Sequence, residues 1–173
     1  TGNIGCEMIR LARAIGLEVV AWSFHPSPEK TARLGFRYVE LGELLATCDA
    51  ISIHLKLTDE SRRLIDAAAL TKMKPGALLV NTSRGPVVQE AALAAALAAG
   101  QIAGAALDVY EHEPQIHEGL RRPNVVLAPH LGSGTVETRT KMAMMAAENV
   151  IALFAGRRPP NILNPEVLDS ART

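Results

Sequence analysis

The feature that most constrains this chain is an alternation between short branched apolar runs and longer stretches with helical periodicity. The runs have the length and composition of buried strands: Glu18–Trp22, Ala50–Ile53, Ala77–Asn81, Ala103–Asp108 and Val125–Leu127. Helical patterns lie before, between and after them: Ile4–Ile15, Glu29–Leu34, Leu41–Thr47, Ala67–Met73, Glu90–Ala99 and Val136–Ala155. Apolar strands separated by helices predict a parallel sheet covered on both faces, and right-handed crossovers make it a doubly wound α/β fold.

Capping and turn residues agree with these boundaries. Asp66 stands where a side chain caps a helix that starts at Ala67, and Pro75-Gly76 ends that helix before the next strand. Gly100 follows the helix that ends at Ala99, where a left-handed residue commonly terminates a helix.

The 173 residues suffice for one domain with a sizeable core. The last long helix ends at Gly156 and runs into Arg157-Arg158-Pro159-Pro160, which is typical of an exit from a domain. We therefore expect one domain over residues 1–156 and a return segment over residues 157–173.

Composition excludes several classes of partner and site. Eighteen basic residues balance eighteen acidic ones, so no global field favours nucleic acid or an anionic membrane. No apolar run approaches the roughly 18 residues of a membrane span, and no signal peptide opens the chain. Two cysteines, Cys6 and Cys48, cannot form a disulfide framework, which favours a cytoplasmic location. No cluster of Cys and His has the spacing of a metal site.

The segment Thr1–Gly5 opens directly into a helix and is similar to the end of a Gly-x-Gly-x-x-Gly phosphate-binding turn. Gly2 would let the backbone approach a pyrophosphate, and Gly5 would let helix and strand pack closely. Free N–H groups where the helix starts, at Asn3 and Ile4, would hold the phosphates. Such a fold has a strand before this turn, so we expect the fold to be truncated at its N-terminal side, without the first central strand.

The coenzyme preference stays open at the end of the next strand. In NAD enzymes a carboxylate usually binds the ribose there, whereas this chain has Ser23. His25, Lys30 and Arg33 are near enough in sequence to assist a 2′-phosphate, although a solvated helix face is the other interpretation of the two basic residues. The cofactor is therefore NAD or NADP.

Three consecutive strand ends offer an arginine, an acid and a histidine. Arg84 follows the strand that ends in Asn81-Thr82, Glu113 lies in the segment that leaves the next strand at Asp108, and His130 follows the strand after that. In open α/β sheets, ligands bind at the carboxyl ends of the strands. Taken singly, these side chains also fit a surface arginine, a loop acid and a strand-end cap, but their combination in this order favours an active site.

The chain resembles the D-isomer-specific 2-hydroxyacid dehydrogenase family over essentially its whole length. The resemblance rests on Gly2–Gly5, His54–Thr58, Met73–Arg84, Gly104–Pro114 and Asn124–Thr138, and the tail Asn161–Val167 is similar to the family's return strand. Within the family, Glu113–His117 and Pro129–Arg139 are most similar to glyoxylate or hydroxypyruvate reductases.

The resemblance implies roles that hydride chemistry also requires. Arg84 would bind the carboxylate of a 2-oxo acid through its planar fork. His130 would give a proton to the carbonyl oxygen, and Glu113 would stabilise its imidazolium form. Asp108 would hold the nicotinamide carboxamide, and Thr82 is expected to contact the cofactor at the same edge.

The resemblance leaves alternatives open. It implies a homodimer and an enzyme that acts on a small 2-oxo or 2-hydroxy acid. The family also includes corepressors that sense a dinucleotide, and phosphoglycerate dehydrogenase is a further alternative for the substrate. We expect these 173 residues alone to be inactive, because the domain that closes over the substrate would lie elsewhere.

Overall fold

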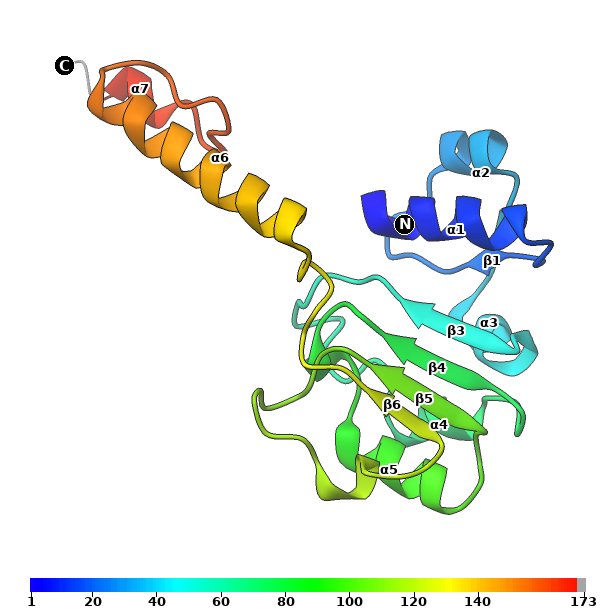
Figure 1. Cartoon of the computed structure of the whole chain (residues 1–173). Coiled ribbons are helices and arrows are strands. Elements are labelled where there is room, and N and C mark those ends of the chain that lie inside the picture. The colour runs from blue at the N-terminus through cyan, green and yellow to red at the C-terminus, as the bar shows by residue number, and fades with distance from the viewer. Residues whose placement is uncertain (171–173) are drawn as a thin grey trace. The chain divides into compact units, whose positions relative to one another are not determined.

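The computed structural model describes residues 1–170, and these form two compact units, Thr1–His130 and the residues from Leu131 on (Figure 1). The strands of the first unit are β1 (Val20–Ala21), β2 (Arg37–Tyr38), β3 (Ala50–Ile53), β4 (Leu78–Asn81), β5 (Gly104–Leu107) and β6 (Val125–Leu127). Its helices are α1 (Asn3–Ala14), α2 (Pro28–Leu34), α3 (Leu41–Thr47), α4 (Ala67–Thr71) and α5 (Glu90–Ala98), with one-turn helices η1 (Gly85–Val87) and η2 (Glu118–Leu120). The second unit holds α6 (Val136–Phe154) and α7 (Val167–Ser170).

The main sheet has the parallel order β3-β4-β5-β6 (Figure 1). Leu79 of β4 is level with Ile51 of β3 and Ala105 of β5, and all three are buried. They belong to one apolar core with Leu70 of α4 and Leu93 of α5, which are at most 1% exposed. The predicted α/β fold with a parallel sheet is confirmed.

The opposite face of this sheet differs from the expectation that both faces are covered. Leu78 and Val126 each lie one residue along their strand from the buried row of Leu79, and so belong to the other face. Their exposed fractions are 48% and 68%. Side chains alternate between the two faces along a strand, and the apolar core of this unit forms against only one of them.

β1 and β2 form a separate parallel pair rather than an extension of the main sheet. The strand predicted over Glu18–Trp22 is reduced to Val20–Ala21, because a strand is defined by its pairing and only these two residues pair with β2. β2 was not expected, since Arg37–Tyr38 lies in no apolar run.

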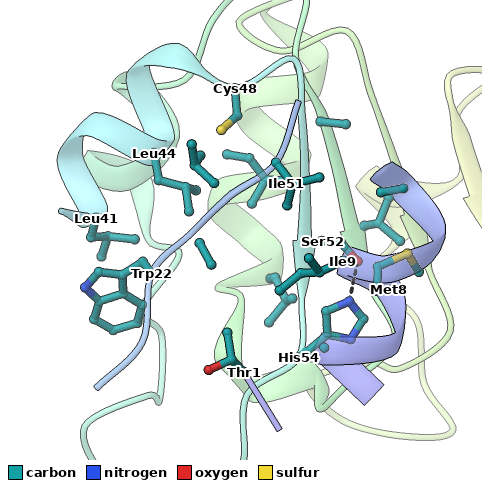
Figure 2. A pocket seen from close by; sticks show the side chains of 18 of the residues that line it. Thr1, Met8, Ile9, Trp22, Leu41, Leu44, Cys48, Ile51, Ser52 and His54 are labelled. Carbon is teal, nitrogen blue, oxygen red and sulfur yellow. Dashed lines mark hydrogen bonds between the residues drawn. The ribbon is translucent and has the colours of Figure 1, made fainter. Parts of the chain in front are cut away.

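A groove of about 660 Å³ separates β1 from β3 (Figure 2). Met8 and Ile9 of α1 line it together with Leu41 and Leu44 of α3, and Trp22 stands at its β1 side. Within residues 1–170, neither bordering strand pairs with another strand across this groove.

The structure confirms the predicted helix ends at Asp66, Gly100 and Gly156, whereas α4 ends at Thr71, before the expected Met73. Asp66 accepts a hydrogen bond from the N–H of Ala69 at 2.8 Å, and so caps α4. Gly100 has a φ of +69° after α5, and Gly156 has a φ of +65° after α6. Both therefore adopt the left-handed conformation that favours glycine at a helix C-terminus.

Candidate active site

The parallel register brings the strand ends to one level. Ile53, Asn81, Leu107 and Leu127 lie in one row across β3, β4, β5 and β6. The segments that leave these strands therefore start from the same carboxyl edge, where α/β folds bind ligands.

Asn81 shapes the segment that carries Arg84. Its side chain is 1% exposed, and its Oδ1 accepts hydrogen bonds from the N–H and the hydroxyl of Ser83 at 3.0 and 2.9 Å. Its Nδ2 donates to the carbonyl oxygen of Arg84 at 3.0 Å. The loop is thus held by a buried amide, while Arg84 itself is exposed at the edge and donates from Nη1 to the oxygen of Ser83 at 2.6 Å.

Glu113 and His130 form a direct pair although they lie 17 residues apart. His130 Nδ1 is 2.9 Å from Glu113 Oε2, and the other carboxylate oxygen accepts the N–H of Tyr110 at 3.0 Å. With Nδ1 protonated, His130 donates to the carboxylate and Nε2 is left for a substrate. The side chains are 51% and 38% exposed, so the pair faces the open edge.

The electrostatics of this pair favour an ionised acid. The hydrogen bond to His130 holds the pKa of Glu113 below its ordinary value, and the N–H of Tyr110 and the charges of His130 and Arg84 act in the same direction. Glu113 is therefore a carboxylate at neutral pH and accepts the hydrogen bond from His130.

Tyr110 fastens this segment and was not singled out from the sequence. Its hydroxyl donates to the carbonyl oxygen of Ala128 at 2.7 Å, two residues before His130. Burial raises the pKa of Tyr110, so its hydroxyl keeps the proton that it donates. Its position inside the Asp108–Pro114 motif was the one sequence signal that could have drawn attention to it. The structure explains its presence there by the hydrogen bond to Ala128 rather than by a role in the chemistry.

His130 has a φ of +55°, a conformation that few residues other than glycine adopt. Strained backbone of this kind concentrates at functional sites, where the surrounding structure holds it in place. Here the hydrogen bond to Glu113 fixes the ring of His130.

The N-terminal segment meets the requirements of a phosphate-binding turn. α1 begins at Asn3, with no acidic residue in its first turn and no side-chain cap, so the N–H groups at Asn3 and Ile4 are not taken by a capping side chain. Gly2 has a φ of −76°, which any residue adopts, and an added Cβ would meet nothing within 4 Å. The fold therefore does not require glycine at this position, whereas a closely approaching phosphate would.

Gly5 is buried and faces the end of β3. A Cβ added at Gly5 would lie 3.5 Å from the Cβ of His54. His54 is half-buried, its Nε2 is 2.9 Å from the hydroxyl of Ser52, and burial holds its pKa below the usual value (Figure 2). A neutral imidazole therefore packs against Gly5 at the end of β3.

Of the remaining predicted cofactor residues, Asp108 and Thr82 lie at this edge, whereas Ser23 follows β1 of the separate β1-β2 pair. Asp108 is 8% exposed at the end of β5, and its N–H donates to the oxygen of Asn81 at 3.0 Å. Thr82 is exposed. Ser23 lies two residues beyond β1, where its hydroxyl accepts the N–H of His25 at 3.3 Å. Lys30 reaches from α2 to the oxygen of Thr1 at 2.8 Å, a contact that sequence spacing did not indicate.

Within residues 1–170, no three or more His, Cys, Asp or Glu side chains converge as a metal site would require. Over the same span, none of the helices combines the length and apolar character that a membrane crossing needs.

Comparison with known proteins finds reductases and dehydrogenases of 2-oxo or 2-hydroxy acids. A glyoxylate reductase of Thermococcus litoralis is 45% identical over 171 residues, which are 98% of this chain and 52% of that protein. The structure of a D-lactate dehydrogenase with NAD⁺ from Lactobacillus jensenii matches 94% of the chain and 53% of its own length, with a TM-score of 0.83 and 28% identity. An NADPH-dependent glyoxylate/hydroxypyruvate reductase from Sinorhizobium meliloti, in complex with NADP and malonate, matches 88% of the chain and 47% of its own length, with a TM-score of 0.82 and 35% identity.

The chain spans about half the length of the curated relatives it matches. Residues 1–132, which contain the whole carboxyl edge described above, match the model of the D-isomer specific 2-hydroxyacid dehydrogenase, NAD binding domain. The chain therefore belongs to the D-isomer-specific 2-hydroxyacid dehydrogenase family.

Proposed function

We propose that the protein containing this chain is an oxidoreductase that transfers a hydride between NADH or NADPH and a small 2-oxo acid of the glyoxylate or hydroxypyruvate kind. The observation that carries the proposal is the Glu113–His130 pair, which places an oriented imidazole at the strand edge next to the Arg84 loop. Relatives named glyoxylate reductase support the substrate class.

The chain's own residues supply binding and proton transfer. Arg84 binds the substrate carboxylate through its guanidinium fork. His130 donates a proton to the carbonyl oxygen as it becomes an alcohol, and in the reverse direction accepts it. Glu113 keeps the imidazole oriented through its hydrogen bond to Nδ1. The bound nicotinamide supplies the hydride.

The residues present fit a dinucleotide. Gly2, Asn3, Ile4 and Gly5 would hold the pyrophosphate at the start of α1, since this helix end has no capping side chain. Asp108 and Thr82 would meet the nicotinamide end, and Ser23 would meet the ribose at the other. Both NAD and NADP remain compatible with Ser23, and solved relatives are described with each.

The domain organisation is part of the proposal. In the common order of such sheets, 3-2-1-4-5-6, the first strand lies between the second and the fourth. The groove between β1 and β3 corresponds to that place, which supports a further central strand there. The assignment of residues 1–156 to the dinucleotide-binding domain and of 157–173 to a return segment stays a prediction.

The assembly and location are also proposed. Ile4, Met8, Leu11 and Ile15 of α1 are between 42% and 78% exposed, which supports an apolar interface in a homodimer. The two cysteines without a disulfide partner support a cytoplasmic location. Light scattering of the purified protein and cell fractionation test these two points.

Nicotinamide absorbance tests the activity. The protein expressed from its complete coding sequence is given glyoxylate, hydroxypyruvate and pyruvate, each with NADH and then NADPH, and compared with His130→Ala. Substrate-dependent oxidation that falls by about 10²- to 10⁴-fold in the variant, as expected for loss of a general acid, supports the proposal. Dinucleotide binding without turnover of any pair would contradict it and favour a corepressor-like sensor. The 173-residue chain alone is expected to show no turnover.

A further inference from the structure

Glu90 and Glu111 are two glutamates outside the proposed catalytic set that bind each other's backbone. Glu90 is 5% exposed at the start of α5, and the side chain of Glu111 is 12% exposed. The N–H of Glu111 donates to Oε1 of Glu90, and the N–H of Glu90 donates to Oε2 of Glu111 at 3.2 Å. This reciprocal arrangement ties the start of α5 to the segment after β5.

Arg63 and His117 extend the connection to two more segments. Arg63 donates from Nε and Nη2 to Oε1 of Glu111 at 3.2 and 3.1 Å, and its own N–H donates to the oxygen of Pro86 at 2.8 Å. The second oxygen of Glu90 accepts the N–H of His117 at 3.3 Å. We name Arg63, Glu90 and Glu111 the acidic clasp.

The clasp lies between the two segments that carry the proposed catalytic groups. Gly85, next to Arg84, packs so closely on the segment after β5 that an added Cβ would lie 1.8 Å from the oxygen of Tyr110. The N–H of Tyr110 in turn donates to Glu113, which pairs with His130. A shift of the clasp therefore moves Arg84 relative to Glu113 and His130.

The composition of the clasp argues against a role in stability alone. Burying two carboxylates beside one partly exposed arginine is unfavourable compared with packing apolar side chains in the same volume. The carboxylates instead fix how the segments are placed, because each of their oxygens accepts a hydrogen bond from a defined N–H group in another segment.

We propose that the acidic clasp is a positioning device that sets the Arg84 guanidinium at the distance from His130 that a bound 2-oxo acid requires. This inference rests on the proposed function. Glu90, Glu111 and Arg63 touch neither substrate nor cofactor and act through the two segments they hold together. The substrate carboxylate, which Arg84 binds, is the part of the ligand most sensitive to the clasp.

Glu90→Gln tests the proposal, because it keeps the shape and turns one acceptor oxygen into a donor that faces an N–H group. In the protein from the complete coding sequence, we expect KM for glyoxylate and Ki for the carboxylate analogue oxamate to rise together by about 10-fold. The expected fall in kcat is smaller, and the dissociation constant of NADH or NADPH stays unchanged. Arg63→Ala produces a weaker effect in the same direction, because Arg63 is exposed.

Glu118→Gln is the matched control, since it removes the same charge from a glutamate whose side chain is 86% exposed and outside the clasp. Melting temperatures of both variants verify that they fold. If Glu90→Gln changes KM and Ki no more than the control, or weakens dinucleotide binding equally, the proposal is wrong.

An activity assay of the wild-type protein distinguishes failure of this inference from failure of the proposed function. If the wild type turns over no 2-oxo acid, the proposed function fails, and amide hydrogen exchange then decides whether the clasp positions the loops. Faster exchange in residues 82–87 and 108–113 of Glu90→Gln than of Glu118→Gln supports the clasp. Equal exchange in the two variants overturns it.

Discussion

The two ends of the carboxyl edge are built differently. At the catalytic end, β4 and β5 have a strand neighbour on each side, and Glu113, His130 and the Arg84 loop are fixed by hydrogen bonds. At the nucleotide end, β1 has one neighbour, α1 borders a groove, and Ile4 is 72% exposed. The catalytic end is therefore organised by this chain's own contacts, whereas the nucleotide end leaves its surfaces for a ligand or further protein.

The largest expected contrast is in stability. Leu93 of α5 is 0% exposed, so Leu93→Ala should cost about 2–5 kcal/mol of unfolding free energy. Leu11 of α1 is 47% exposed, so Leu11→Ala should cost well under half as much. Urea unfolding of both variants measures the difference. Equal costs would mean that Leu11 is covered in the assembled protein, and that the nucleotide end is as well packed as the catalytic end.

Arg84→Lys tests whether the catalytic end binds the substrate independently of the dinucleotide at the other end. Lysine keeps the charge but loses the planar fork, and with it a charge-assisted hydrogen bond to the substrate carboxylate. Because such a bond contributes about 1.5–3 kcal/mol, kcat/KM for glyoxylate should fall by about 10- to 100-fold. Dinucleotide affinity should not change. Steady-state kinetics and fluorescence titration provide the two measurements, and a matching loss of dinucleotide binding would contradict the division.

Glu113→Gln sharpens the comparison through pH. In the wild type the pKa of Glu113 lies below its ordinary value, so the carboxylate stays ionised at neutral pH and accepts the hydrogen bond from His130. Glutamine is neutral at every pH, so kcat/KM for reduction at neutral pH should fall by about 10- to 100-fold, because a hydrogen bond to a charged group contributes about 1.5–3 kcal/mol. The gap between the two proteins should narrow as the pH falls through the lowered pKa of Glu113, because the wild-type side chain then also becomes neutral. Any stabilisation from the Glu113–His130 pair is present above the ordinary carboxyl pKa and lost as the pH falls through the lowered one. Equal kcat/KM values at neutral pH would exclude the proposed role of Glu113.

The smallest effect is expected for Gly2→Ala, which tests dinucleotide binding at the nucleotide end. The φ of −76° and the open space around Gly2 mean that alanine fits the free protein, so the melting temperature should not fall. A methyl group at the phosphate approach should weaken NADH binding by about 10-fold, or ~1.4 kcal/mol. Calorimetric melting and titration test this, and loss of stability with unchanged affinity would mean that the glycine serves the fold.

The sequence predicted the catalytic end more fully than the nucleotide end, for a physical reason. Arg84, Glu113 and His130 each follow a run of apolar residues, and parallel strands bring such ends to one edge whatever the details of packing. The segment Gly2–Gly5 was interpreted as a phosphate-binding turn because its glycines stand at the start of a helix, and this interpretation stays a prediction. The short pairing of β1 with β2 was not, because a two-residue strand has no periodicity of its own.

The sequence by itself determined the order of the main strands and helices apart from β2, the family, and the side chains expected at the carboxyl edge, because apolar periodicity and strand-end chemistry are local properties. Only the tertiary structure decided which groups meet. The bond between Glu113 and His130 spans 17 residues, and the bonds between Glu90 and Glu111 span 21. The separation of β1 from β3 by a groove was likewise visible only in three dimensions. Such contacts depend on how far neighbouring strands reach and how closely loops pack, and the spacing of residues along a chain does not contain those distances.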